Sequence, residues 1–222
     1  MAALPRMLTA DDAAAIGARV RTCEARTGVQ VVVALVDRTD RFHGLRWRAF
    51  AFGSGVMAVA VVAADRLRPD WVTAHTALLT ATWILGAGLA LALAASCWPR
   101  FARLFLQHSR AHAAVNQRAR VLFLEHELFA TPRRDAILML AGRFERVMTV
   151  IGDTAYRGRI GDDDWRRVVD ATTAGLAAGN ARTAFVAGLD AIEQLLVARG
   201  FVTDGTSRNA LPDAPLEIDD TP

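Results

Sequence analysis

The sequence predicts an α/β domain that is interrupted by a two-helix transmembrane hairpin. Two kinds of segment lead to the α/β prediction: short apolar runs rich in β-branched residues, such as residues 29–36, and amphipathic helical segments around them. A third observation leads to the hairpin. Residues 49–64 and 71–98 form two apolar blocks that contain no Asp, Glu, Lys or Arg.

The two apolar blocks have lengths that suit membrane helices. The second block is long enough to cross a hydrocarbon core of about 30 Å, which needs about 20 helical residues. The first block is shorter, and the flanking Trp47 and Arg48 would extend it through the interface. Small residues at Gly86 and Gly88 predict close helix packing, either within the hairpin or with another membrane protein. The alternative is that both blocks are core helices of a soluble protein.

Arginine residues are denser at the ends of the hairpin than in its loop. In the loop, Arg66 and Arg68 lie beside Asp65 and Asp70. The positive-inside rule therefore predicts that both chain termini lie in the cytoplasm, as in a multi-pass protein of a bacterial inner membrane. The arginines on the terminal side are Arg41, Arg46, Arg48, Arg100, Arg103 and Arg110.

The segments before the hairpin form an incomplete domain. Residues 9–26 predict a helix that Thr9 or Asp11 caps, and a Thr-Gly pair separates this helix from the strand at 29–36. A strand that is buried on both faces needs partner strands. We therefore expect its partners to come from beyond the hairpin.

The segments after the hairpin supply these partners. Apolar runs at 136–141 and 146–151 predict a β-hairpin. Helices are predicted at 111–129, 162–175 and 181–199. Pro, Asp, Ser and Thr dominate from residue 202 onward, which predicts disorder. The predicted parts are residues 9–48 and 99–200 for the α/β domain, 49–98 for the transmembrane hairpin and 201–222 for a disordered tail.

Two separated stretches carry a resemblance to a known family. Residues 24–42 read EARTGVQVVVALVDRTDRF and include Thr39, Asp40 and Phe42 near their end. Residues 118–171 combine a helix, an apolar strand, a Glu-Arg turn, a second strand and a polar loop. Together they resemble the TPM domain family, in its small bacterial membrane-anchored form. The matching positions of the second stretch are Glu145, Arg146, Asp153 and Trp165.

The resemblance implies a small sheet with helices on both faces, in which the strand at 29–36 pairs with the later strands. Some TPM domains bind a divalent metal or show weak phosphatase activity. This sequence departs from the family pattern at Gln30, at Asp135-Ala136 and after Asp153, where Thr154 to Tyr156 intervene before a glycine. The departures affect the loops that would carry both properties.

An acidic cluster is the main candidate for a binding site. Asp153 lies in a polar loop, and Asp162, Asp163 and Asp164 follow at the start of a predicted helix. Carboxylates on a short loop can bind a hard cation such as Ca²⁺ or Mg²⁺ through oxygen ligands. The alternative is that the three consecutive Asp residues cap the helix and offset its dipole.

Histidines and cysteines provide weaker candidates. His108 and His112 have the spacing of many zinc pairs on a helix, but no third ligand follows, so we interpret them as a polar face beside the membrane. His75 lies near the interfacial end of a predicted membrane helix. Cys23 and Cys97 are too far apart to suggest a metal motif or a disulfide framework, and buried or membrane-facing thiols are expected.

The sequence excludes several classes of function. It contains no G-x-S-x-G motif, no P-loop and no dinucleotide fingerprint. A scattered net charge of +3 does not predict binding to nucleic acid. We expect a non-catalytic accessory or assembly/maintenance factor for a membrane complex, without a cofactor, whose partners are the bilayer and other membrane proteins. The alternative is a weak divalent-metal-dependent phosphatase or hydrolase, with Ca²⁺ or Mg²⁺ bound near Asp153, Asp162 and Asp163.

Overall fold

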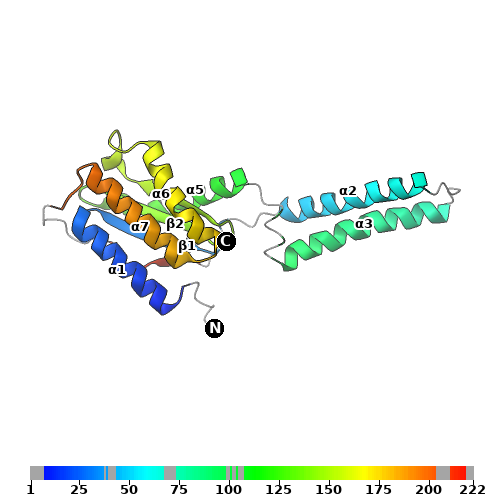
Figure 1. The fold of residues 1–222 in the computed structure, drawn as a ribbon, viewed down its shortest axis with the longest axis horizontal. Helices are drawn as coiled ribbons and strands as arrows, with labels where there is room; N and C mark the ends of the chain where they lie inside the picture. Colours follow the sequence, from blue (N-terminus) through cyan, green and yellow to red (C-terminus); the bar gives the residue numbers. More distant parts are fainter. Residues whose placement is uncertain are drawn as a thin grey trace. The chain divides into compact units, whose positions relative to one another are not determined.

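The structure, a computed structural model, describes residues 8–37, 39, 44–67, 74–98, 101, 104, 108–203 and 211–218. The chain divides into two compact units. One unit combines the residues up to 40 with those from 108 onward, and the other consists of residues 41–107. The first is a mixed α/β unit and the second contains two long helices, so the predicted fold class is confirmed (Figure 1).

The sheet of the α/β unit joins segments from both sides of the helical unit. Its strand order is β3-β2-β1-β4. β1 is parallel to β2, from Gln30 opposite Ala136 to Val36 opposite Gly142, whereas β2 and β3 are antiparallel. The strand before the hairpin therefore pairs with a strand after it, as the sequence predicts. The strands are β1 (Gln30–Val36), β2 (Ala136–Gly142), β3 (Val147–Gly152) and β4 (Leu216–Ile218).

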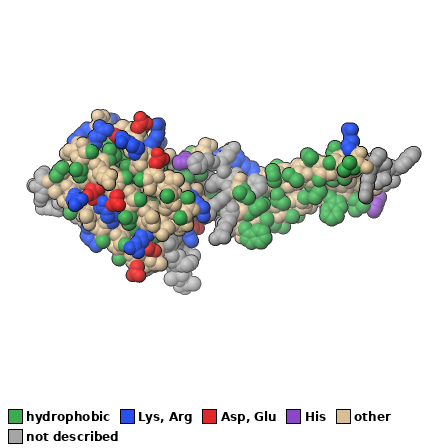
Figure 2. Space-filling model, in the orientation of Figure 1, with side chains coloured by type: hydrophobic (Ala, Val, Ile, Leu, Met, Phe, Trp, Pro, Cys, Tyr) green, Lys and Arg blue, Asp and Glu red, His purple; other side chains and the backbone are tan. Residues whose placement is uncertain are grey.

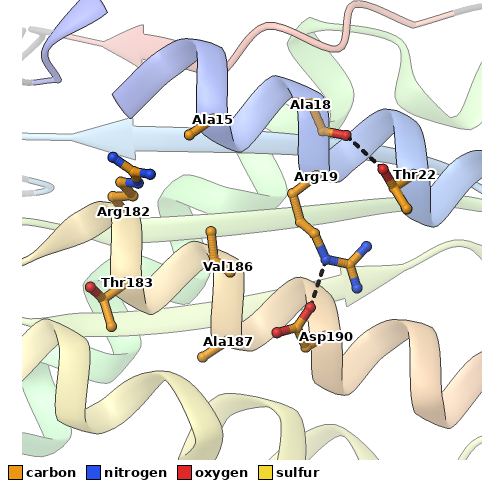
Figure 3. A pocket seen from close by; sticks show the side chains of 9 residues that line it. All are labelled: Ala15, Ala18, Arg19, Thr22, Arg182, Thr183, Val186, Ala187 and Asp190. Carbon is orange, nitrogen blue, oxygen red and sulfur yellow. Dashed lines mark hydrogen bonds and ion pairs between the residues drawn. The ribbon is translucent and has the colours of Figure 1, made fainter. Parts of the chain in front are cut away.

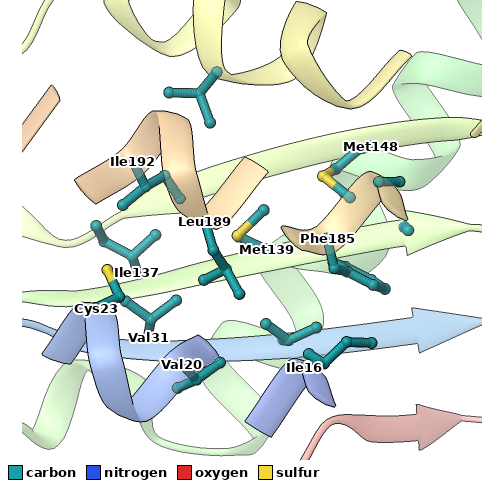
Figure 4. Close-up of a cluster of buried hydrophobic side chains, with 14 of the residues drawn as sticks. Ile16, Val20, Cys23, Val31, Ile137, Met139, Met148, Phe185, Leu189 and Ile192 are labelled. Carbon is teal, nitrogen blue, oxygen red and sulfur yellow. The ribbon is translucent and has the colours of Figure 1, made fainter. Parts of the chain in front are cut away.

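Helices cover both faces of this sheet. On one face, alternate strand residues such as Val31 and Met139 pack against apolar residues of three helices, including Phe185 and Leu189 (Figure 4). On the other face, the hydroxyl of Thr149 donates a hydrogen bond to the side-chain oxygen of Asn116. The helices of the first face are α1 (Ala10–Thr27), α6 (Asp162–Ala177) and α7 (Ala181–Ala198), and the helix of the second face is α5 (His108–Glu125).

Local signals set the ends of α1. The Thr9 hydroxyl accepts a hydrogen bond from the backbone nitrogen of Asp12 at 3.1 Å, and the Asp12 carboxylate accepts one from the Thr9 nitrogen at 3.4 Å. This capping box satisfies two backbone donors at the start of the helix. At the other end, Gly28 adopts a φ of 71°, and its nitrogen donates to the Glu24 carbonyl at 2.7 Å. A left-handed glycine is a common helix terminator.

The predicted disorder of residues 201–222 is wrong for part of that segment. Leu216–Ile218 forms β4, which pairs in parallel with β1 from Ala34 to Val36. The polar composition of the segment conceals this short strand. Its backbone groups find partners on the edge of β1, and such long-range pairing leaves no signal in local composition. Residues 204–210 and 219–222 lie outside the described residues.

The helical unit contains α2 (Gly44–Leu67) and α3 (Ala74–Cys97), which are long and apolar enough to cross a membrane. Their apolar windows are only 11% and 6% buried, whereas a core helix of a soluble protein would be mostly covered. Figure 2 shows hydrophobic side chains over their surface. Glycines form the seam between them: a Cβ at Gly53 would lie 2.8 Å from the Ala87 carbonyl oxygen. Gly88 also lies in the seam, but Gly86 faces open space.

Candidate functional site

The candidate acidic loop connects β3 to α6 and is held in place at Asp153. The Asp153 nitrogen donates to the Ala136 carbonyl at 3.0 Å, which fixes the loop against the start of β2. The Asp153 carboxylate accepts a hydrogen bond from the Thr154 nitrogen at 2.6 Å and caps a short 3₁₀ turn, η3 (Thr154–Tyr156). Gly158 then turns the chain with a φ of 77°. The loop therefore has a defined shape.

The charge of Asp153 is neutralised by an arginine. Arg134 contacts both carboxylate oxygens, with Nε 2.9 Å from Oδ2 and Nη2 3.3 Å from Oδ1. Arg134 reaches this position from a left-handed backbone conformation with a φ of 54°. A bidentate arginine pair of this kind occupies the oxygens that a cation would need. A metal ion at Asp153 would therefore have to displace Arg134.

The three aspartates of α6 have different surroundings. Asp164 is buried and accepts a hydrogen bond from the Gly161 nitrogen at 3.2 Å, which caps the helix. It also pairs with Arg167, and with Arg199 at 2.5 Å. The Gly161 N–H and these arginines hold the pKa of Asp164 below its ordinary value. Asp163 is 86% exposed and pairs with Arg166, and Asp162 is exposed. The structure therefore supports the capping interpretation for Asp164.

A cavity of about 520 Å³ brings Asp153 and Asp162 together. The cavity does not include Asp163 among its lining residues. Within the described parts of the chain, no group of three or more His, Cys, Asp or Glu side chains is arranged to hold a metal ion. The cavity offers carboxylate, guanidinium and aromatic groups, which suit the binding of a small polar ligand. Its other polar and aromatic lining residues include Thr154, Tyr156, Arg157, Trp165 and Phe123.

Tyr156 lines this cavity and is itself buried. Its ring packs edge-on against Trp165, with a centroid separation of 5.8 Å. Its hydroxyl donates a hydrogen bond to the backbone oxygen of Asp135. Burial raises the pKa of Tyr156 above its ordinary value, so the phenol stays protonated. Sequence reasoning did not identify Tyr156 or Arg134 as parts of the site, because each depends on a partner that is distant along the chain.

Two of the residues that carry the family resemblance contact each other. The backbone nitrogen and the hydroxyl of Thr39 both donate to the Glu145 carboxylate, at 2.9 and 2.8 Å. This contact ties the chain after β1 to the turn between β2 and β3. Arg146 lies in that turn with a φ of 54°. Asp40 and Phe42 lie outside the described residues.

The histidine and cysteine candidates are scattered. His108 begins α5 and His112 follows one turn later, while His75 lies at the start of α3. Cys23 is buried in the α/β core, and burial raises its pKa to about 12, so the thiol is neutral at physiological pH. Cys97 is exposed at the end of α3. The two cysteines belong to different units.

A second cavity, of about 570 Å³, lies between α1 and α7 (Figure 3). Small side chains, including Ala15, Ala18 and Ala187, form its walls. Arg19 points across it, with Nε 2.6 Å from Asp190 and Nη2 2.7 Å from Glu193. These two carboxylates neutralise the guanidinium. The remaining guanidinium nitrogen of Arg19, Nη1, is buried and has no hydrogen-bond partner among the described residues.

No protein-family model matches the chain, and no curated protein matches it. The structure is similar to the NMR structure of the BA42 protein from the psychrophilic bacterium Bizionia argentinensis, with a TM-score of 0.58. The two chains are 14% identical, and the match covers 98% of this chain and 99% of the other. At this identity the likeness shows a shared fold.

Proposed function

We propose that this chain is a membrane-anchored, TPM-like domain protein that serves as a non-catalytic accessory or assembly/maintenance factor for a membrane complex. The observation that carries the proposal is the insertion of two exposed apolar helices into an α/β unit whose sheet is built from both sides of the insertion. Such an insertion anchors a folded domain at two points of its chain. The contact between Thr39 and Glu145 joins two of the positions on which the TPM resemblance rests.

The state of the acidic residues supports a role without catalysis. Asp153 is paired with Arg134, and Asp164 caps α6 while pairing with two arginines. Carboxylates in these pairs stabilise local structure, and a metal ion at Asp153 would have to displace Arg134. We propose other membrane proteins as partners, because exposed apolar surfaces of this extent mark sites of membrane or protein contact.

The arrangement in the membrane can be tested directly. We propose an inner-membrane protein with a cytoplasmic α/β unit, because arginines are denser at the ends of the hairpin. The chain should then stay in the membrane pellet after washing with high salt, and release by salt would contradict the proposal. For orientation, Asp163→Cys in a Cys97→Ser chain should react with an impermeant maleimide only after the inner membrane is opened. Labelling in intact spheroplasts would place the α/β unit outside.

The proposed role calls for a test in the host cell. Deletion of the gene for this protein from the host cell should lower the amount of at least one intact membrane complex on native gels. The wild-type chain should restore that complex, and so should the double variant Asp153→Asn, Asp162→Asn. A chain that lacks residues 44–98 should fail. Failure of the aspartate variant, with its fold verified by circular dichroism, would contradict a non-catalytic role.

A metal-dependent hydrolase is the second candidate, because Asp153 and Asp162 line the same cavity. In that case Ca²⁺ or Mg²⁺ should raise the melting temperature of the full chain by linkage. Arg134→Ala should increase the response, because it frees the Asp153 carboxylate, and Asp153→Asn should abolish it. A flat response in the wild type and in Arg134→Ala would remove this candidate.

A further inference from the structure

The turn between β2 and β3 lies beside the chain that leaves the α/β unit for α2. β1 and β2 are parallel, so they finish side by side. The Arg143 nitrogen donates to the Val36 carbonyl at 2.9 Å. The Phe144 nitrogen donates to the Asp37 carbonyl, also at 2.9 Å. The turn is therefore bound to the last residues before the helical unit, which begins at residue 41.

α5, which follows the helical unit, begins at the same end of the sheet. A Cβ at Gly142, the last residue of β2, would lie 3.1 Å from Val115 in the first half of α5. Phe123, two turns later, lines the cavity that contains Asp153 at the opposite end of the sheet. α5 therefore starts where β2 finishes. Arg110 precedes Val115 by five residues, so it lies about 7.5 Å nearer the start of this helix.

Three exposed arginines, Arg110, Arg143 and Arg146, thus share one end of the α/β unit, which we call the basic end. Within the described residues, Arg110 and Arg146 make no ion pair. Arg143 lies 3.3 Å from Asp37, but both side chains are more than half exposed, and such pairs contribute little. Glu145, in the same turn, is buried. The described residues of this end therefore present a net positive charge to their surroundings.

The opposite end of the sheet has a different charge balance. There Arg134 pairs with Asp153, and Arg133 lies 3.4 Å from Asp135. The charges of these arginines are met by carboxylates of the same chain. The basic end instead fits a partner that brings negative charge.

We infer that the basic end binds the phosphate groups of anionic phospholipids and so holds the α/β unit against the membrane surface. The inference rests on the proposed anchoring by α2 and α3. Gly44, the first residue of α2, follows Asp37 by seven residues, which span at most about 25 Å. A membrane helix that starts there keeps the basic end within reach of lipid headgroups. Guanidinium groups bind phosphate through paired hydrogen bonds.

The anchor explains why a few arginines suffice. A protein that binds membranes by charge alone uses larger basic clusters, whereas a tethered surface meets its partner at a high effective concentration. Each arginine near an anionic surface favours the bound state by about fivefold, so Arg110 and Arg146 together should shift the ratio of bound to unbound α/β unit by about 25-fold. High salt screens this attraction.

The full chain in lipid vesicles tests the inference. A fluorescent label is attached at Ser109→Cys, beside Arg110, in a Cys97→Ser chain, while the Cys23 thiol is buried and stays unlabelled. The vesicles carry a lipid with a nitroxide on its headgroup, which quenches the label only at short range. Quenching should be stronger in vesicles that contain phosphatidylglycerol than in vesicles of phosphatidylcholine alone. High salt should remove this difference.

Paired variants separate the basic end from overall charge. Arg110→Gln with Arg146→Gln should lose the additional quenching that phosphatidylglycerol causes. Arg120→Gln with Arg157→Gln removes the same charge from exposed positions, about three turns along α5 and in the loop after β3, and should keep it. Arg110→Lys with Arg146→Lys should also keep a response that salt removes, because the positive charges remain.

Flotation of the same vesicles at high salt separates this inference from the proposed function. A chain that leaves the vesicles would overturn the proposed anchoring and this inference with it. A chain that stays, but is quenched equally in both kinds of vesicle, overturns this inference alone and favours an acidic protein surface as the partner. Equal losses in the two glutamine pairs would also overturn it, because the response would then follow overall charge.

Discussion

The two units of this chain place their apolar side chains in opposite surroundings. In the α/β unit, Phe185 and Leu189 are 0% exposed. In the helical unit, Trp83 and Leu85 are 65% and 58% exposed. Both units are rich in apolar residues, so composition alone does not separate them. Burial within the chain stabilises the first unit in water, whereas the second needs an apolar environment that the described chain does not provide.

A matched pair of leucines gives the largest expected difference between the units. Leu189→Ala removes a fully buried side chain from α7 and should lower the free energy of unfolding of the α/β unit by about 2–5 kcal/mol. Leu89→Ala replaces a side chain on α3 that is 56% exposed. This variant should change the free energy of unfolding of the α/β unit by less than about 0.5 kcal/mol. Hydrogen exchange of the β1 and β2 amides, measured in micelles at increasing urea concentrations, reports the free energy of unfolding of both variants. Equal losses would show that the units do not differ as described.

The same contrast explains which parts of the fold could be predicted from the sequence. β1 and β2 are short apolar runs, and α2 and α3 are long ones, so local composition was sufficient for each. β4 was not predicted, because it forms only by pairing with β1, which lies far from it along the chain. In the candidate site, Asp153 and Asp162 were predicted, but Arg134 was not. Its pairing with Asp153 requires the loop geometry that only the folded chain provides.

The helical unit should be more sensitive to added volume in its seam than on its surface. Gly53→Leu introduces a Cβ that would lie 2.8 Å from the Ala87 carbonyl oxygen, a backbone atom of the facing helix, so the helices must separate, at a cost of about 1–3 kcal/mol. Gly86→Leu adds the same volume where no atom lies within 4 Å, and it should have little effect. Spin labels at the exposed Val56 and Leu85 positions would report the separation by pulsed electron resonance. An unchanged distance in Gly53→Leu would contradict the observed seam.

The smallest expected effect concerns charge at the start of α6. Asp164→Ala removes the cap on the Gly161 nitrogen and should cost about 0.5–2 kcal/mol. Asp163→Ala, beside it, removes an exposed ion pair and should cost less than about 0.5 kcal/mol. The folded state lowers the pKa of the Asp164 carboxyl. Its ionised form therefore stabilises the fold above the ordinary pKa of an aspartate, and this stabilisation disappears as the pH falls through the lowered pKa of the folded state. Urea unfolding at neutral and acid pH would therefore show the two variants converging in acid. If the free energies of unfolding of the two variants differ by the same amount at both pH values, the contribution of Asp164 arises from packing and not from its charge.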